Sequence, residues 1–173
     1  MFHRVKHLFV WLSRIMHCRG FGIQSPTDYS LVRYVINEHW PYYHYSEVGS
    51  DDNWLKRKLG RLYLRLANWR QPSVVDSADY RDYISAGSRR TVFGTSTEMI
   101  VLPIEQADDN RLSTIYNKVD DKSLLVLEGL WRNKARWKEI IADSRTRIIF
   151  DLYYCGIVLF DSKRTKQYYI INF

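Results

Sequence analysis

The stretch Ser73-Val74-Val75-Asp76-Ser77-Ala78-Asp79 decides how the fold of this chain is interpreted. Its apolar first half predicts a buried β-strand, and a helical segment follows, as in the strand–loop–helix units that bind nucleotides. A loop that holds a phosphate or an adenosine needs glycine here, because only a residue without Cβ lets the backbone pass close to the ligand. The stretch contains no glycine. The sequence therefore predicts the frame of a cofactor-binding domain without its cofactor loop.

Downstream of this stretch, short apolar runs alternate with helical segments, which predicts an α/β fold. The expected strands cover residues 73–76, 90–93, 98–103, 123–128, 146–152, 155–161 and 167–172. The expected helices cover residues 79–86, 108–119 and 132–143. Short glycine-containing or polar segments separate the last three strands, so we expect that end of the sheet to be antiparallel.

Upstream, residues 1–71 are expected to form a helical extension that joins residues 72–173 in one compact unit. The expected helices cover about 2–18, a segment that starts at Ser25-Pro26-Thr27-Asp28 and ends before Pro41, and 54–69. An aromatic, polar loop precedes the third of these helices. The first helix carries an apolar run at residues 8–12, which is too short to span a bilayer. We expect it to pack on the domain or, as the alternative, to lie on a membrane surface.

Length and composition predict one basic, folded domain. The chain has 173 residues, a net charge of +7 and two cysteines. Two cysteines are too few for a disulfide framework, so we expect a cytoplasmic protein in which both cysteines are reduced thiols. A run of basic residues on the third helix gives a candidate anion-binding set of Lys56, Arg57, Arg61 and Arg65. This charge fits either a solvated helix face or a surface for nucleic acid or anionic lipid.

Three segments carry a resemblance to a known family. Residues 18–26, Cys-Arg-Gly-Phe-Gly-Ile-Gln-Ser-Pro, resemble the Gly-Phe-Gly-x-His-Ser-Pro signature of a group of bacterial class I S-adenosylmethionine-dependent methyltransferase-like proteins. Residues 58–72 resemble the helix that precedes the cofactor strand in that group, and residues 150–173 resemble its C-terminal strands. The resemblance implies a seven-stranded Rossmann-like sheet whose penultimate strand is antiparallel, with S-adenosylmethionine as the cofactor.

The chain departs from that family in its centre. The family pattern places glycines where Ser77, Ala78 and Asp79 stand, and an acid after the second strand where this chain has Gly94-Thr95. Residues 77–98 provide only 22 positions between Asp76 and Met99, whereas one strand–helix–strand unit takes roughly 30 residues. We therefore expect a reduced sheet that lacks one or two strands, their helices and one wall of the cofactor pocket.

These departures favour a degenerate methyltransferase homologue that has no methyl-transfer activity and binds a macromolecular partner through helix 54–69 or loop 40–45. The alternative is a divergent methyltransferase with a rebuilt S-adenosylmethionine site. Asp76 and Asp79 would then hold the cofactor, and Glu105 and Glu128 are the candidate catalytic residues, because open α/β sheets bind ligands at the carboxyl ends of their strands. A third hypothesis is a basic nucleic-acid or anionic-surface binding module. A homodimer could cover the edge that lost strands leave. No metal site is expected.

Overall fold

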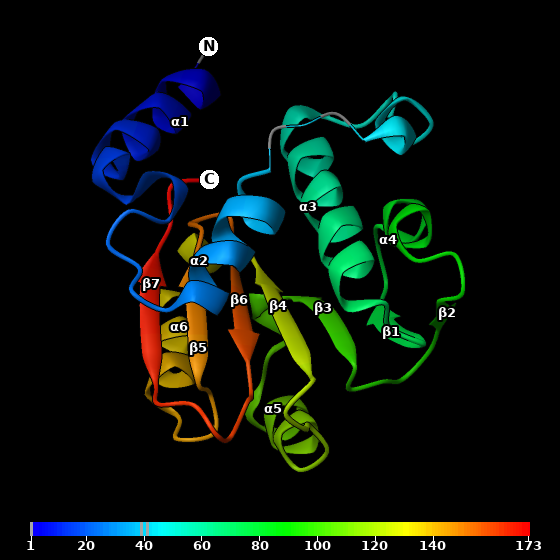
Figure 1. Cartoon of the computed structure of the whole chain (residues 1–173), viewed down its shortest axis with the longest axis vertical. Helices are drawn as coiled ribbons and strands as arrows, with labels where there is room; N and C mark the ends of the chain where they lie inside the picture. Colours follow the sequence, from blue (N-terminus) through cyan, green and yellow to red (C-terminus); the bar gives the residue numbers. More distant parts are fainter. Residues whose placement is uncertain (1, 39, 41) are drawn as a thin grey trace.

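A computed structural model describes residues 2–38, 40 and 42–173. It contains a seven-stranded mixed sheet with helices on both faces (Figure 1). The strands are β1 (Val74–Ser77), β2 (Val92–Phe93), β3 (Met99–Pro103), β4 (Leu124–Glu128), β5 (Ile148–Asp151), β6 (Cys155–Leu159) and β7 (Gln167–Ile170). Their order in the sheet is β2-β1-β3-β4-β6-β5-β7, and only β6 runs antiparallel to its neighbours. The α/β class and the seven expected strands are confirmed.

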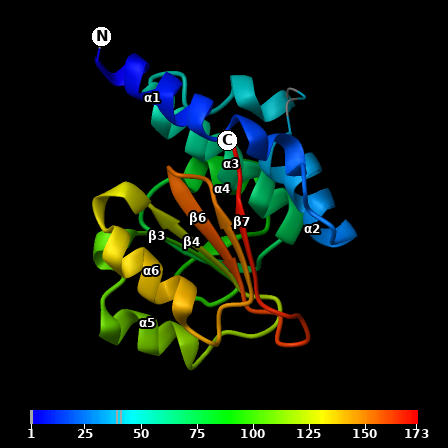
Figure 2. The same cartoon turned by 90° about the vertical axis from the view of Figure 1, so that its left-hand side faces the viewer.

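The central strands β3 to β6 are buried on both faces, and successive side chains enter two different cores. In β4, Leu124 and Val126 pack in one core, whereas Leu125 and Leu127 pack in the other. The first core lies under α2 (Pro26–Leu31), η2 (Val32–Ile36), α3 (Trp54–Arg70) and α4 (Arg81–Gly87). The second lies under α5 (Asp109–Tyr116) and α6 (Lys134–Ala142), on the opposite face of the sheet (Figure 2). This period-two division of a nearly continuous apolar run is typical of a parallel sheet that is covered on both sides.

The N-terminal segment differs from the expected single helix over residues 2–18. The α-helix α1 (Phe2–Ser13) ends where Arg14 leaves helical geometry (φ −112°, ψ 13°), and a 3-10 segment, η1 (Ile15–Gly20), follows. At this bend the Arg14 side chain leaves the helix to reach Asp151 at the end of β5. The ion pair between Arg14 and Asp151 therefore forms at the point where further turns of helix were expected.

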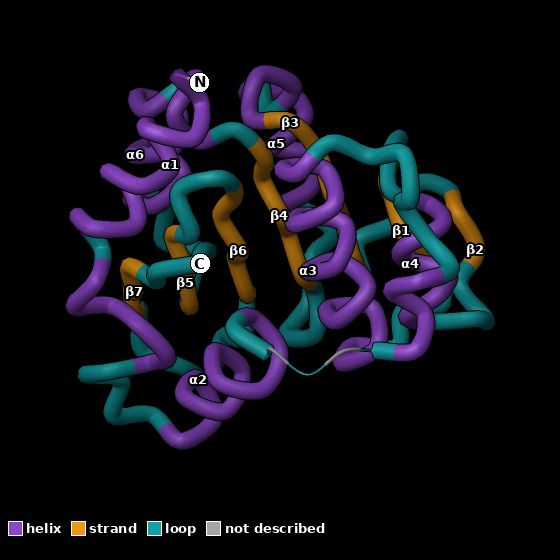
Figure 3. The backbone as a smooth tube through the Cα atoms, turned by 90° about the horizontal axis from the view of Figure 1, so that it is seen from above, coloured by secondary structure: helices purple, strands orange, loops and turns teal. Residues whose placement is uncertain are grey.

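The next two helices begin as their sequence signals predict. Ser25 caps the first of them and Pro26 occupies its first turn, and Asn53 caps α3. The first continues as the π-helical turn η2, and α3 ends at Gln71, whose backbone is left-handed, one residue before Pro72. Both helices share their core with the strands, so they form one layer of the fold (Figure 3).

The centre of the chain is short, as expected, but the prediction of a sheet that lacks one or two strands is wrong, because the sheet has seven strands and β7 adds one at the far edge. A single helix, α4, and a two-residue strand, β2, separate β1 from β3. At the other end of the sheet, β6 runs opposite to β5 and β7, as expected, but β7 pairs with β5 in parallel and adds an outer strand there. The sheet is thus short at its β2 edge and extended at its β7 edge. Within the described part of the chain, no helix is long and apolar enough to cross a membrane.

Candidate functional site

The strand order reverses at β1, which pairs with β2 on one side and with β3 on the other. In open α/β sheets the crevice outside the carboxyl ends of the strands at such a point is where ligands bind. A cavity of about 210 Å³ lies here. It is lined by the loop after β1, the ends of β3 and β4, and side chains from the start of α5: Asp76, Ser77, Ala78, Asp79, Tyr80, Val101, Leu102, Pro103, Gln106, Asp108, Arg111 and Glu128.

Three of the four expected acids line this cavity, and Asp76 is the one with an ionic partner there. Asp76, Asp79 and Glu128 are among the lining residues. The Asp76 carboxylate forms an ion pair with the Arg111 guanidinium, a charged donor that could otherwise face a ligand. Asp79 is exposed, and its backbone carbonyl accepts a hydrogen bond from the Ser77 hydroxyl. Glu105 lies outside the lining and pairs with Arg132 at 3.2 Å.

Tyr80 ends the glycine-free loop after β1. Its backbone is left-handed (φ 63°, ψ 20°), a conformation that glycine adopts freely and tyrosine rarely does. The ring packs edge-on against Tyr63, with 4.8 Å between the ring centroids, and Tyr80 lines the crevice together with Glu128. Tyr80, Pro103 and Glu128 also line a neighbouring cavity of about 230 Å³, so they form the wall between the two spaces. The loop thus reaches a glycine-like conformation but adds a side chain to the wall of the crevice.

Behind Tyr80 lies a buried cluster of titratable groups. The Tyr63 hydroxyl donates to Glu128 Oε1 at 2.6 Å. Burial raises the pKa of Glu128, although the hydrogen bond from Tyr63 and the nearby Tyr80 hydroxyl oppose that shift. Burial also raises the pKa values of Tyr63 and of the Cys155 thiol well above their usual ranges, and the nearby Glu128 charge adds to both effects. The cluster therefore favours neutral side chains and forms a floor under the crevice.

The basic residues that were expected to bind anions have different surroundings. Lys56 pairs with Asp52 at 2.9 Å. Arg57 donates to the carbonyl oxygens of residues 49, 50 and 52, which fixes the loop before α3. Arg65 is buried, and it donates to the backbone carbonyls of Val35 and Ile36 at 2.6 and 2.9 Å. Lys56 and Arg65 are thus held by protein groups.

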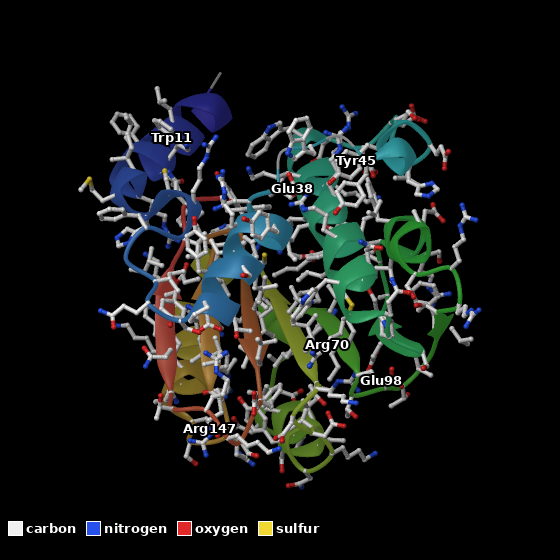
Figure 4. All side chains as sticks on the ribbon, in the orientation of Figure 1. Trp11, Glu38, Tyr45, Arg70, Glu98 and Arg147 are labelled. Atoms are coloured by element: carbon white, nitrogen blue, oxygen red, sulfur yellow. The ribbon has the colours of Figure 1, made fainter. Side chains whose placement is uncertain are left out.

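A second candidate site lies between α3 and η2. This cavity of about 240 Å³ is lined by Ile36, Asn37, Glu38, Trp54, Arg57, Lys58, Arg61, Arg65 and Phe173. Arg61 lies over the ring of Tyr45, 4.7 Å from its centroid, and Figure 4 labels this tyrosine and Glu38. Two buried donors of the lining, Arg61 Nε and Asn37 Nδ2, have no hydrogen-bond partner within the described residues. Burial, with the Arg65 charge, lowers the pKa of Lys58 to about 8.

Sequence reasoning missed Tyr80, Lys58 and Asn37. Helical spacing could have identified Lys58, because it lies three residues before Arg61 and so shares a face with it, whereas Lys56 does not. Of the expected binding loop 40–45, position 41 lies outside the described residues, and Trp40 is exposed. Within the described ranges, no group of three or more His, Cys, Asp or Glu side chains could hold a metal ion.

We found no match to this chain among protein-family models, curated proteins or solved structures. The function of the chain is therefore inferred from its own residues.

Proposed function

We propose that this protein is a methyltransferase-like binding protein that does not transfer methyl groups. The observation that carries the proposal is Tyr80, whose side chain lines the crevice at the strand-order reversal and narrows it. A cofactor larger than the remaining cavity of about 210 Å³ would have to displace this ring from its contact with Tyr63. The loop also lacks the glycines that would let its backbone approach a ligand.

The sheet supports the methyltransferase-like part of the proposal. The resemblance implies a single antiparallel strand in the penultimate position. Here β6 is the single antiparallel strand, and it would be penultimate if the outer strand β7 were removed. The short connection through α4 and β2 supports the loss of activity, because it leaves little chain to build a wall on the β2 side of the crevice.

Titration calorimetry with S-adenosylmethionine and S-adenosylhomocysteine tests the proposal directly. We expect no heat of binding from the wild-type protein at millimolar ligand. Micromolar binding that is lost in Asp76→Asn would contradict it and favour the divergent enzyme with Asp76, Asp79, Glu105 and Glu128 in its site. A Glu98→Gln variant, which changes an acid outside the crevice lining, serves as the matched control.

The cavity between α3 and η2 favours a specific binding role, the capture of a small anion that carries a phosphate group. Its lining brings Arg57, Lys58, Arg61 and Arg65 together with one acid, Glu38. Buried donors without partners are costly, and an anion with several acceptor oxygens would satisfy Arg61 Nε and Asn37 Nδ2 at once. Lys58 would gain a partner in the same step.

Inorganic phosphate and pyrophosphate are suitable probes for this cavity. We expect saturable binding that weakens as the salt concentration rises and that falls at least about tenfold in Arg61→Gln, since a charge-assisted hydrogen bond is worth roughly 1.5–3 kcal/mol. Lys118→Gln removes one exposed positive charge outside the cavity and should leave binding unchanged. Equal loss in the two variants would show that only net charge matters, and preferred binding of a nucleic acid would favour the third hypothesis instead.

A further inference from the structure

The N-terminal segment presents large apolar side chains to solvent. Seven of them are 46% to 75% exposed: Leu8, Phe9, Trp11, Leu12, Ile15, Met16 and Phe21. Single exposed apolar residues are normal, but a continuous group on one segment marks an interaction site. A helix of twelve residues is also marginal by itself in water, so it gains from a surface that covers it.

Among residues 8–13 of α1, the exposed apolar side chains lie on one face. At about 100° per residue, Leu8, Phe9, Trp11 and Leu12 fall within a sector of roughly 160°. The half-buried Val10 falls outside this sector, on the other side of the helix. The helix lies at the edge of the molecule (Figure 2), and Figure 4 labels Trp11 on it.

Polar contacts, not this apolar face, fasten the segment to the sheet. Arg14 Nη2 pairs with Asp151 Oδ1 at 2.7 Å, and Arg14 Nη1 donates to the Asp151 carbonyl oxygen at the same distance. The backbone amide of Asn172 donates to the His17 carbonyl oxygen at 2.9 Å, and its side chain donates to the Trp11 carbonyl oxygen at 3.2 Å. The face formed by Leu8, Phe9 and Leu12 is thus held in place and left open.

The charge of the segment indicates what covers this face. Residues 1–27 contain four Lys or Arg residues and no Asp or Glu, and the first acid of the chain is Asp28. A second copy of the chain would bring two such acid-free segments together, which like-charge repulsion opposes. An anionic bilayer offers both an apolar layer for the exposed side chains and negative headgroups for the basic ones.

We propose that residues 8–21 attach this protein to the surface of an anionic phospholipid bilayer. The helix α1 lies parallel to the membrane plane, with Phe9, Trp11 and Leu12 in the headgroup–acyl boundary. The exposed Arg19 side chain lies at the level of the headgroups. The sheet, the crevice and the cavity between α3 and η2 stay on the aqueous side. This attachment is independent of the proposed binding function, because it uses neither cavity.

Vesicle co-sedimentation of the full chain tests the proposal. We expect binding to vesicles of phosphatidylcholine mixed with phosphatidylglycerol and at least about tenfold weaker binding to phosphatidylcholine alone. The double variant Phe9→Glu/Leu12→Glu should lose binding to both kinds of vesicle. Ser13→Glu/Thr27→Glu adds the same charge at exposed polar positions of the segment and should retain most of the binding to the mixed vesicles. The substituted side chains are already exposed, so circular dichroism should show both variants folded.

Two outcomes would overturn the proposal. Equal loss of binding in the two double variants would show that charge alone attaches the protein and that the apolar face does not enter the bilayer. If the wild type bound no vesicles and sedimented as a dimer that Phe9→Glu/Leu12→Glu dissociates, a second copy would be the occupant of this face. Calorimetry with S-adenosylhomocysteine and phosphate would be unaffected in either case, so failure here is separable from failure of the proposed function.

Discussion

We expect the Tyr80→Gly variant of the protein to be more stable than the Tyr80→Ala variant, which is the reverse of the usual order. Both substitutions remove the edge-on contact with Tyr63, worth about 0.5–1.5 kcal/mol. Tyr80→Ala keeps the penalty of a left-handed backbone (φ 63°), which is about 1–2 kcal/mol for a residue with Cβ. Tyr80→Gly removes that penalty. We therefore expect both variants to be destabilised, with the glycine variant more stable by about 1 kcal/mol.

Urea-induced unfolding followed by circular dichroism would measure this difference, because both variants unfold to nearly the same state and their slopes should agree. Tyr80→Phe provides the control, since it keeps the ring and the backbone conformation and loses only the hydroxyl group. An alanine variant as stable as the glycine variant would refute the reasoning. It would mean that residue 80 is not left-handed in the folded protein and that its ring is not fixed in the crevice.

Three further predictions concern buried polar groups. Asp28→Ala should lower the free energy of unfolding by about 3–5 kcal/mol in urea titrations, because Asp28 is 1% exposed and its loss leaves Arg164 unpaired. The raised pKa of Glu128 means that the folded protein holds this proton more tightly than the unfolded chain does, so the contribution of Glu128 to stability should fall as the pH rises above about 4.5. In urea titrations at several pH values, the stability of Glu128→Gln relative to the wild type should therefore rise with pH; a constant difference between the two proteins would exclude this group. Under native conditions a thiol reagent should modify Cys18 and spare Cys155, which is fully buried and whose pKa burial raises; equal rates would contradict that burial.

The strands were predictable because their sequence patterns are local. Residues 124–127 are four consecutive apolar residues, and such runs indicate strands that are buried on both faces. Caps were equally clear, since Ser25 and Asn53 stand directly before helices and accept backbone hydrogen bonds there. The position of β7 beyond β5 was not predictable, because pairing partners depend on tertiary packing that no local pattern records.

The sites were less predictable than the sheet. Nothing local indicates that Tyr80 is left-handed, since tyrosine disfavours that conformation and the surrounding fold imposes it. The burial of Arg65 depends on backbone carbonyls about thirty positions earlier in the chain, at Val35 and Ile36. By contrast, the sequence alone places Lys58 three residues before Arg61 and so on the same face of the helix, which was enough to predict that the two side chains lie together.

The contacts that fasten residues 11–17 come from Asp151 and Asn172, late in the chain. Residues 11–17 are synthesised more than a hundred residues before these attachment points. Until Asp151 and Asn172 have left the ribosome, this apolar, basic segment therefore lacks the polar contacts that fasten it in the folded protein. A nascent chain could reach an anionic bilayer before its sheet is complete, and closure of the fold would then take place at the membrane surface.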